Sequence, residues 1–160
     1  MRSVRVLILG VGSMSVLTAA HARANASYPA LFYRLPGEGR GPAFAGKRSG
    51  LRFEFQRDSY SIYSDRGRFT IRFTGARDGA RLEGGGAMGR LSRLIGRATI
   101  ETTPIFQYVA CRGVYDGVDV LFRSSEGSPL ESEFYIAPGA SPDVIALRYD
   151  GASELREDGS

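Results

Sequence analysis

The sequence lacks several residue types on which enzyme chemistry and small-domain stability often depend. Its 160 residues contain no tryptophan, one cysteine (Cys111), one histidine (His21) and one lysine (Lys47). A single cysteine excludes any disulfide bond within the chain. Because Val109, Ala110 and Val114 lie near Cys111 in the sequence, we interpret it as a small core residue rather than a nucleophile or an intermolecular bridge.

The first 24 residues have the composition of a secretory signal peptide. Two arginines precede an apolar run from Val6 to Ala20, and small residues follow it. The run is shorter than the roughly 20 apolar residues that a bilayer-spanning helix needs. We therefore predict export to the cell surface or medium with cleavage after Ala24, and Ala22 and Ala26 are competing sites. After cleavage we expect no membrane span.

Cleavage would change what chemistry the chain can perform. His21 would leave, so a Ser-His or Cys-His dyad and a histidine metal ligand are excluded from the mature chain. The net charge would fall from +4 to about +1, because residues 25–160 hold 18 basic and 17 acidic residues. Aromatic residues do not alternate with the basic residues of 25–50, so no nucleic-acid partner is predicted.

Beyond the leader, the residue pattern predicts an all-β domain. We interpret residues 25–50, rich in Gly, Pro and Arg, as a flexible leader with a short strand at 31–34. Residues 51–160 then form eight or nine short antiparallel strands, in a β-sandwich or a strongly curved sheet. We predict the strands from alternating apolar residues at 51–56, 60–63, 68–73, 80–83, 105–112, 118–123, 130–136, 144–149 and 153–156. Residues 90–95 and 98–101 are additional candidates outside this count.

Three features qualify this assignment of strands. Gly84-Gly85-Gly86 predicts a break after the strand at 80–83, and the apolar residues of 90–95 also fit one helical turn. The glycines are not a phosphate loop, because no Gly-Lys-Ser/Thr step follows them. Asp158-Gly159-Ser160 has the composition of a hairpin turn without a return strand, so we expect the chain to be a fragment truncated at its C-terminal hairpin.

Six segments between residues 51 and 160 form a recognisable series: Leu51-Arg52-Phe53, Thr103–Phe106, Val114–Val120, Leu130–Phe134, Ile136–Pro142 and Ile145–Ala152. Through these segments, residues from about 51 to 160 resemble the N-terminal β-rich domain of unknown function in secreted bacterial SBBP (β-propeller-type) repeat proteins. The resemblance implies an exported domain of a bacterial surface or extracellular protein, normally followed by propeller-type repeats. It implies no catalytic residues, since none are known for the family.

Asp116 and Asp119 are the first candidates for chemistry, as calcium ligands or an acid/base pair. Calcium needs six to eight oxygen ligands, and two aspartates fall short of that number. We favour a turn at Asp116-Gly117 and a hydrogen bond between Asp119 and the backbone at a strand start.

Glu131 and Glu133 are the second candidates, because they share one strand face with roughly 7 Å between their Cα atoms. Glycosidases use paired carboxylates at such separations. Surface ion pairing with Arg123 on the neighbouring strand is the interpretation we favour.

The tyrosines are the third candidates, as a sugar-binding face. We expect most of them to lie in the core or half-buried in strands instead. They are Tyr60, Tyr63, Tyr108, Tyr115, Tyr135 and Tyr149.

From these residues we predict a non-catalytic, exported structural or interaction module. We predict no catalytic residue, cofactor or metal, and we expect downstream repeat modules, and a cell-surface glycan or protein, as partners. The alternatives are a carbohydrate-binding module, which predicts exposed coplanar aromatic residues, and an accessory domain of a glycan-processing enzyme. The latter predicts a cleft holding Glu131 or Glu133 with a second carboxylate opposite.

Overall fold

The computed structural model describes residues 2–7, 30–36, 41–95 and 99–151. Within them, eleven strands form one antiparallel sheet, and a three-residue 3-10 turn at Pro142–Val144 precedes the last strand. The strands are β1 (Arg2–Leu7), β2 (Leu31–Arg34), β3 (Phe44–Arg48), β4 (Leu51–Phe55), β5 (Ser59–Ser64), β6 (Gly67–Phe73), β7 (Arg81–Ile95), β8 (Thr99–Tyr115), β9 (Val118–Arg123), β10 (Glu131–Ile136) and β11 (Leu147–Asp150).

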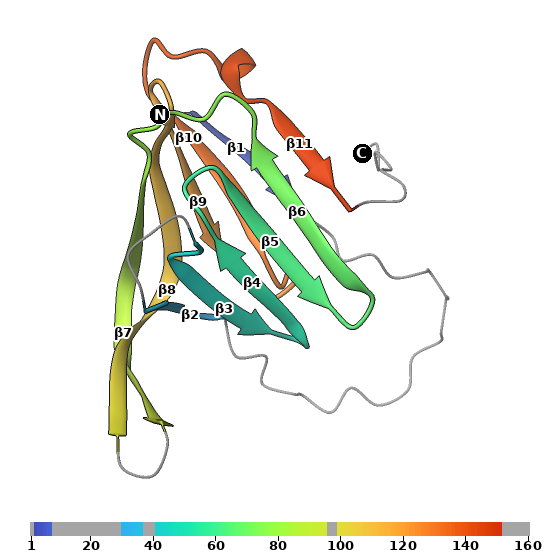
Figure 1. The fold of residues 1–160 in the computed structure, drawn as a ribbon. Helices are drawn as coiled ribbons and strands as arrows, with labels where there is room; N and C mark the ends of the chain where they lie inside the picture. Colours follow the sequence, from blue (N-terminus) through green and yellow to red (C-terminus); the bar gives the residue numbers. More distant parts are fainter. Residues whose placement is uncertain (1, 8–29, 37–40, 96–98, 152–160) are drawn as a thin grey trace.

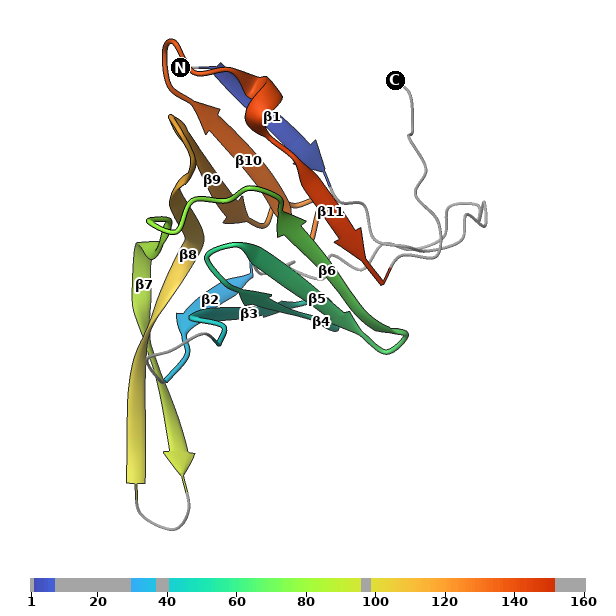
Figure 2. The same ribbon diagram turned by 45° about the horizontal axis from the view of Figure 1, so that its top comes forward.

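The sheet curls strongly into a half-barrel (Figures 1 and 2). Its strand order is β1-β10-β9-β8-β2-β3-β4-β5-β6-β11, and β7 pairs with β8 outside this path. Of the two predicted architectures, the strongly curved sheet is therefore confirmed. In both views β1 lies between β10 and β11, while the far half of the β7–β8 hairpin extends beyond the curled sheet.

Short turns and alternating residues explain the best-predicted strands. In β9, Val118, Val120 and Phe122 are buried while the residues between them are half-exposed, which is the period of a strand with one face on the core. The β8–β9 hairpin turns at Asp116-Gly117, where Gly117 has φ of +66°. Only glycine adopts such a backbone angle at little cost, so the predicted turn is confirmed.

The long β7 strand corrects the prediction of a break at the glycine triplet. Gly84 and Gly85 pair with Val109 and Tyr108 of β8, and the strand continues to Ile95. A Cβ atom on Gly85 would lie 2.1 Å from the Tyr108 ring, so an aromatic side chain fills the space that a side chain at 85 would need. Glycine therefore lets the strand continue beneath an aromatic ring instead of ending it.

The same pairing explains two further differences from the prediction. From Thr99, β8 runs without interruption through the region expected as two strands, 98–101 and 105–112, because β7 pairs with it from Thr99 to Arg112. The register shifts between Ala87 and Gly89, which marks a β-bulge.

Aromatic side chains from distant strands form the core inside the curl. The Phe122 ring lies 4.8 Å from Phe55 and 4.9 Å from Tyr60, measured between ring centroids, and Phe73 packs edge-on against Phe134 at 6.2 Å. Burying a side chain of this size contributes about 1.5–3 kcal/mol, and each favourable ring pair adds about 0.5–1.5 kcal/mol. The cluster thus joins β4, β5 and β6 to β9 and β10 across the half-barrel.

The leader prediction is wrong for residues 41–50. β3 lies in the sheet between β2 and β4, and Phe44 and Ala45 are buried. The Gly- and Arg-rich composition concealed this strand, because only two of its side chains are apolar. The predicted strand at 31–34 is confirmed as β2.

The two ends of the chain complete the comparison. The strand predicted at 144–149 begins only at Leu147, because the 3-10 turn occupies 142–144. The strand predicted at 153–156 lies outside the described residues. β1 falls within the predicted signal peptide and pairs with β10 over six residues. In the described part of the chain, no helix is long and apolar enough to cross a membrane.

Candidate functional site

The strongest concentration of polar chemistry lies on β10, in two glutamates that we call the β10 carboxylate pair (Glu131 and Glu133). Alternation along the strand sends Ser132 and Phe134 into the core, where the Ser132 hydroxyl lies 3.0 Å from the Tyr60 hydroxyl. The glutamates therefore share the opposite face. Both are buried nonetheless: Glu131 is 8% exposed and Glu133 is 2% exposed.

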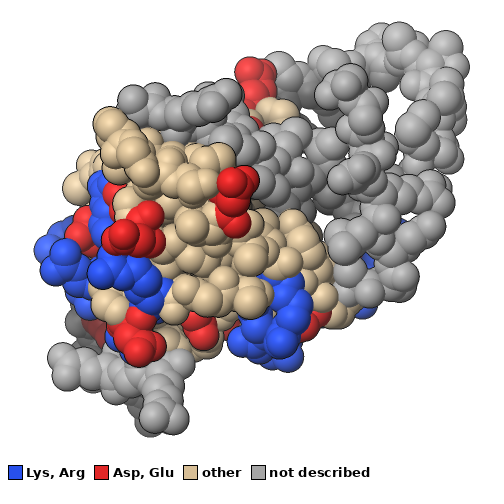
Figure 3. Space-filling model, turned by 90° about the horizontal axis from the view of Figure 1, so that it is seen from above, with Lys and Arg blue, Asp and Glu red and all other residues tan. Residues whose placement is uncertain are grey.

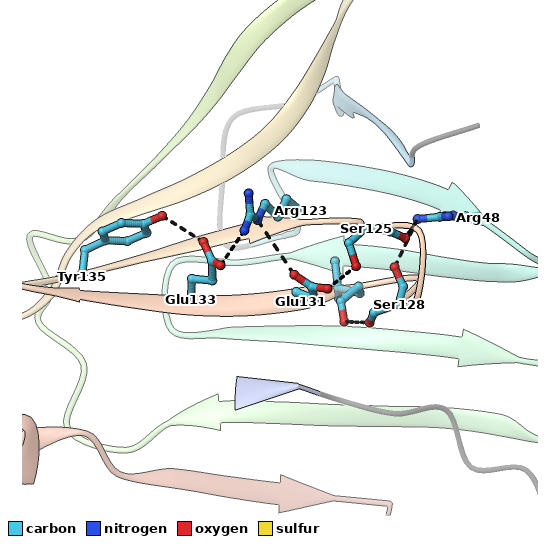
Figure 4. A network of polar contacts seen from close by, with 8 residues as sticks. Arg48, Arg123, Ser125, Ser128, Glu131, Glu133 and Tyr135 are labelled. Carbon is cyan, nitrogen blue, oxygen red and sulfur yellow. Dashed lines mark hydrogen bonds and ion pairs between the residues drawn. The ribbon is translucent and has the colours of Figure 1, made fainter. Parts of the chain in front are cut away.

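Glu133 is held by a cation and a hydroxyl (Figure 4). Arg123 of β9 donates from Nη2 to Glu133 Oε1 at 2.6 Å, and Tyr135 donates its hydroxyl to Glu133 Oε2 at 2.9 Å. These two contacts engage both carboxylate oxygens of a side chain that water hardly reaches. Hydrogen bonds and an opposite charge are what a buried carboxylate needs to remain ionised at low cost.

Glu131 shares the same arginine. Arg123 Nε lies 3.9 Å from Glu131 Oε2, while the Ser125 hydroxyl donates to Glu131 Oε1. From the β9 side, one guanidinium thus serves two carboxylates. The predicted pairing of Arg123 with a glutamate is confirmed, but the expectation of an exposed sheet surface is wrong, because the pair is buried.

The β9–β10 loop is fixed by a second arginine from across the sheet. Arg48 of β3 donates from Nη1 to the backbone carbonyl oxygens of Ser125 and Ser128, the latter at 3.1 Å. The Ser128 hydroxyl in turn donates to the carbonyl of Leu130 at 2.9 Å. Sequence reasoning missed this role of Arg48, since nothing in the residue pattern relates β3 to a loop about 80 residues later.

The geometry of the pair fits an internal ion-pair cluster better than acid/base chemistry. A general acid or base must reach the proton of a substrate. Here, Arg123, Tyr135 and Ser125 contact the carboxylate oxygens, and both glutamates lie on one strand rather than on opposite walls of a cleft.

Asp116 and Asp119 do not converge on a common site. The side chain of Asp116 is 97% exposed at the hairpin turn, with Arg77 Nη1 at 3.4 Å from its Oδ1. Asp119 accepts a hydrogen bond from the backbone N–H of Gly113 at 2.7 Å, as predicted, and pairs with Arg112 Nη1 at 2.9 Å. Its hydrogen bond raises the pKa of Arg112.

Asp119 therefore stabilises the place where β8 and β9 lose their register. The register of the two strands shifts between Cys111 and Tyr115. The backbone N–H of Gly113, which donates a hydrogen bond to Asp119, lies within that irregularity. A side-chain acceptor there replaces a backbone partner, which is a structural use of the carboxylate.

Cys111 is a core residue, as predicted. It is fully buried, and its thiol donates to the carbonyl oxygen of Arg57 at 3.3 Å. Burial is the main cause that raises the pKa of this thiol to about 12. A thiol with so high a pKa is not a nucleophile at neutral pH, because the thiolate is the reactive form.

The tyrosines lie in or beside the core, as most were predicted to. Tyr60 and Tyr115 are buried, and the other four are half-buried. The Arg52 guanidinium lies over the Tyr63 ring at 4.1 Å from the ring centroid. The Tyr149 ring stacks on the Phe69 ring with 5.9 Å between their centroids. One face of each of these two rings therefore contacts another side chain of the protein.

A polar hollow over β4, β5 and β6 is a second feature that sequence reasoning missed. Ser61 and Thr70 meet there across the β5–β6 hairpin at 2.9 Å, and Tyr63 donates to Glu54 at 2.7 Å. The short polar residues alternating along β5 were the available signal. Its lining comprises Glu54, Gln56, Ser59, Tyr60, Ser61, Tyr63, Arg68, Thr70 and Arg72.

Charges of both signs are intermixed on the surface. On the face seen from above, acidic and basic side chains lie next to one another (Figure 3). Arg72, for example, contacts Asp150 at 2.7 Å, and this contact is the main cause that lowers the pKa of Asp150. Among the described residues, no three His, Cys, Asp or Glu side chains group in a way that could hold a metal ion.

Comparison with known proteins places this curled sheet in a class of β-rich domains without an assigned role. The family described as "Domain of unknown function (DUF7948)" matches residues 39–160, so the chain belongs to that family. No curated protein and no solved structure matches the chain. The match begins before β3, in agreement with the place of that strand inside the sheet.

Proposed function

We propose that this protein is an exported, non-catalytic β-domain that serves as a structural or interaction module of a bacterial surface or extracellular protein. The observation that carries the proposal is that the β10 carboxylate pair is engaged in contacts with neighbouring side chains of the same protein. Arg123, Tyr135 and Ser125 contact the carboxylate oxygens of Glu131 and Glu133, which were the main candidates for acid/base chemistry. Such contacts are those of a residue that holds strands together.

Export is supported by the sequence alone. The charged N-terminus, the apolar run Val6–Ala20 and the small residues around Ala24 follow the order of a signal peptide. We propose that propeller-type repeats normally follow the domain, on the basis of its resemblance to SBBP repeat proteins.

The alternative of carbohydrate binding has weaker support. Sugar-binding faces present flat aromatic rings to solvent, whereas Arg52 lies over one face of the Tyr63 ring and Phe69 stacks on one face of the Tyr149 ring. The polar hollow over β4–β6 contains hydroxyl groups, but Ser61 and Thr70 already bond to each other.

Export is tested by expressing the full chain in a bacterial host and separating the cytosol from the extracytoplasmic fractions. We expect the extracytoplasmic protein to begin at Asn25 by N-terminal sequencing. A Leu9→Arg variant places a charge in the apolar run and should stay uncleaved in the cytosol, while the matched Leu9→Val variant should be processed normally. Wild-type protein that keeps Met1 and remains in the cytosol would contradict the proposal.

A further inference from the structure

β10 is built as an interior strand of the sheet rather than as an edge. Five of its six residues are buried, including residues of both faces. Burial on both faces is typical of strands with a neighbour on each side, whereas edge strands present exposed, charged residues. β9 pairs with one side of β10, and β1 pairs with the other.

The strand that pairs with the second side belongs to the predicted signal peptide. Arg2–Leu7 lie antiparallel to Glu131–Ile136 through six register pairs. Cleavage after Ala24 would remove these residues from the exported protein. The outer edge of β10 would then present unpaired N–H and C=O groups, which is a ready template for another strand.

The charges beside this edge define what kind of strand fits. The carboxylate pair shares one guanidinium from the β9 side, so a basic side chain arriving from the other side adds a complementary charge. The register of β1 has this pattern. Arg5 stands opposite Glu133, with Val4 opposite Phe134 and Val6 opposite Ser132, the two core-facing positions.

We propose that the outer edge of β10 is a strand-acceptor site for an extended peptide of a partner protein. The peptide binds antiparallel to β10, with a basic residue opposite Glu133 and apolar residues on either side of it. Binding by strand addition gains affinity from backbone hydrogen bonds and specificity from alternate side chains. In the precursor, Arg2–Leu7 occupy the site. The inference rests on the proposed export, because processing is what frees the edge.

A second copy of this chain is a poorer occupant than a basic peptide. Pairing β10 with the β10 edge of another copy would bring further carboxylates to a face that already carries Glu131 and Glu133. Like charges opposite each other in a sheet are destabilising. The occupant is therefore a strand whose charge is opposite to that of β10.

The site is first tested in the full-length precursor, made by cell-free synthesis without membranes. Residues directly opposite in an antiparallel pair lie about 4.5–5.5 Å apart between Cα atoms, within disulfide range. Ser3 stands opposite Tyr135. We expect a Ser3→Cys/Tyr135→Cys variant to form the disulfide at least tenfold faster than the matched Val4→Cys/Tyr135→Cys variant, whose cysteines would point to opposite faces. Equal rates would overturn the register, and with it the acceptor site.

The second test uses the exported, processed chain and labelled synthetic peptides. A peptide of residues 2–7 (RSVRVL) should bind, and its charge-reversed version (RSVEVL) should bind at least tenfold more weakly by fluorescence anisotropy. A Glu133→Gln domain should reduce that ratio while keeping its β-sheet circular-dichroism spectrum. Failure of both peptides to bind overturns the proposal, as does self-association of the chain in sedimentation without peptide binding. If the chain is never processed, the proposed export fails, and the cross-linking result still decides whether β10 accepts a strand.

Discussion

Replacing Arg123 by methionine tests directly whether the β10 carboxylate pair stabilises the sheet. The substitution keeps an unbranched apolar stem and removes the guanidinium that contacts Glu131 and Glu133. Breaking a fully buried ion pair costs about 3–5 kcal/mol, and breaking an exposed one costs about 0–1 kcal/mol. Here, Glu133 is 2% exposed but the Arg123 side chain is 40% exposed. We therefore expect an intermediate loss of about 2 kcal/mol.

Urea unfolding of the full chain, followed by circular dichroism because the chain lacks tryptophan, measures this loss. With a urea dependence of about 1–3 kcal/mol per molar for small proteins, the midpoint should fall by about 1 M. The matched control is Arg72→Met, which removes the exposed pair with Asp150, whose side chain is 40% exposed. That variant should lose clearly less stability than Arg123→Met, because solvent screens an exposed ion pair.

A double-mutant cycle separates the ion pair from other effects of the substitution. Glu133→Gln keeps the shape of the side chain and removes its charge, so Arg123→Met should cost less in that background. We expect a coupling energy of about 1–2 kcal/mol. The reasoning is refuted if Arg123→Met costs no more than Arg72→Met, or if the two substitutions at positions 123 and 133 are additive.

Three further predictions follow from single contacts. Gly85→Ala should lower the free energy of unfolding by about 2 kcal/mol in thermal denaturation, because the added Cβ would meet the Tyr108 ring. The control Gly79→Ala places its Cβ in open space and should change the free energy of unfolding by less than about 0.5 kcal/mol. Similar losses in the two variants would contradict the packing of Gly85 against Tyr108. Cys111 should react with a thiol reagent at pH 8 only after unfolding, and rapid labelling of the native chain would show that the thiol is not buried. Because the pKa of Cys111 rises from 9.0 to about 12 on folding, the stability held by its protonated thiol is complete below pH 9 and is lost as the pH rises toward 12. Alkaline urea titrations should therefore show a smaller stability loss above pH 9 in Cys111→Ala than in wild type, and identical slopes would contradict this.

Local patterns predicted the parts of the fold that depend on neighbouring residues. The alternation in 118–123 gave both the strand and its buried face, and the Asp116-Gly117 turn needed only the identity of two residues. A hydrogen bond between Asp119 and the backbone was likewise predicted, since a carboxylate beside a turn can accept a hydrogen bond from a nearby backbone N–H.

Long-range pairing explains what the sequence could not reveal. Glycine has a low strand propensity, so the glycines of β7 by themselves predict a break in the strand. Glycine is favourable at position 85 only because the Tyr108 ring of the partner strand fills the space that a side chain would need. The link between Arg123 and a glutamate followed from strand order, but its burial depends on how the sheet curls. The role of Arg48 joins residues about 80 positions apart, and no local pattern records it.

Hydrogen exchange of the full chain, read by mass spectrometry, tests the central claim most directly: one curled sheet uses its chemically capable side chains to hold its strands. Amides of Val109–Cys111, Val118–Phe122 and β10 should exchange slowest, because they pair inside the sheet with buried side chains around them. In Arg123→Met, exchange should accelerate in β10 and the end of β9 while β5 and β6 stay unchanged. Exchange in β8–β10 as fast as in the exposed loop at Gly75–Gly79, or no local response to the substitution, would contradict the account.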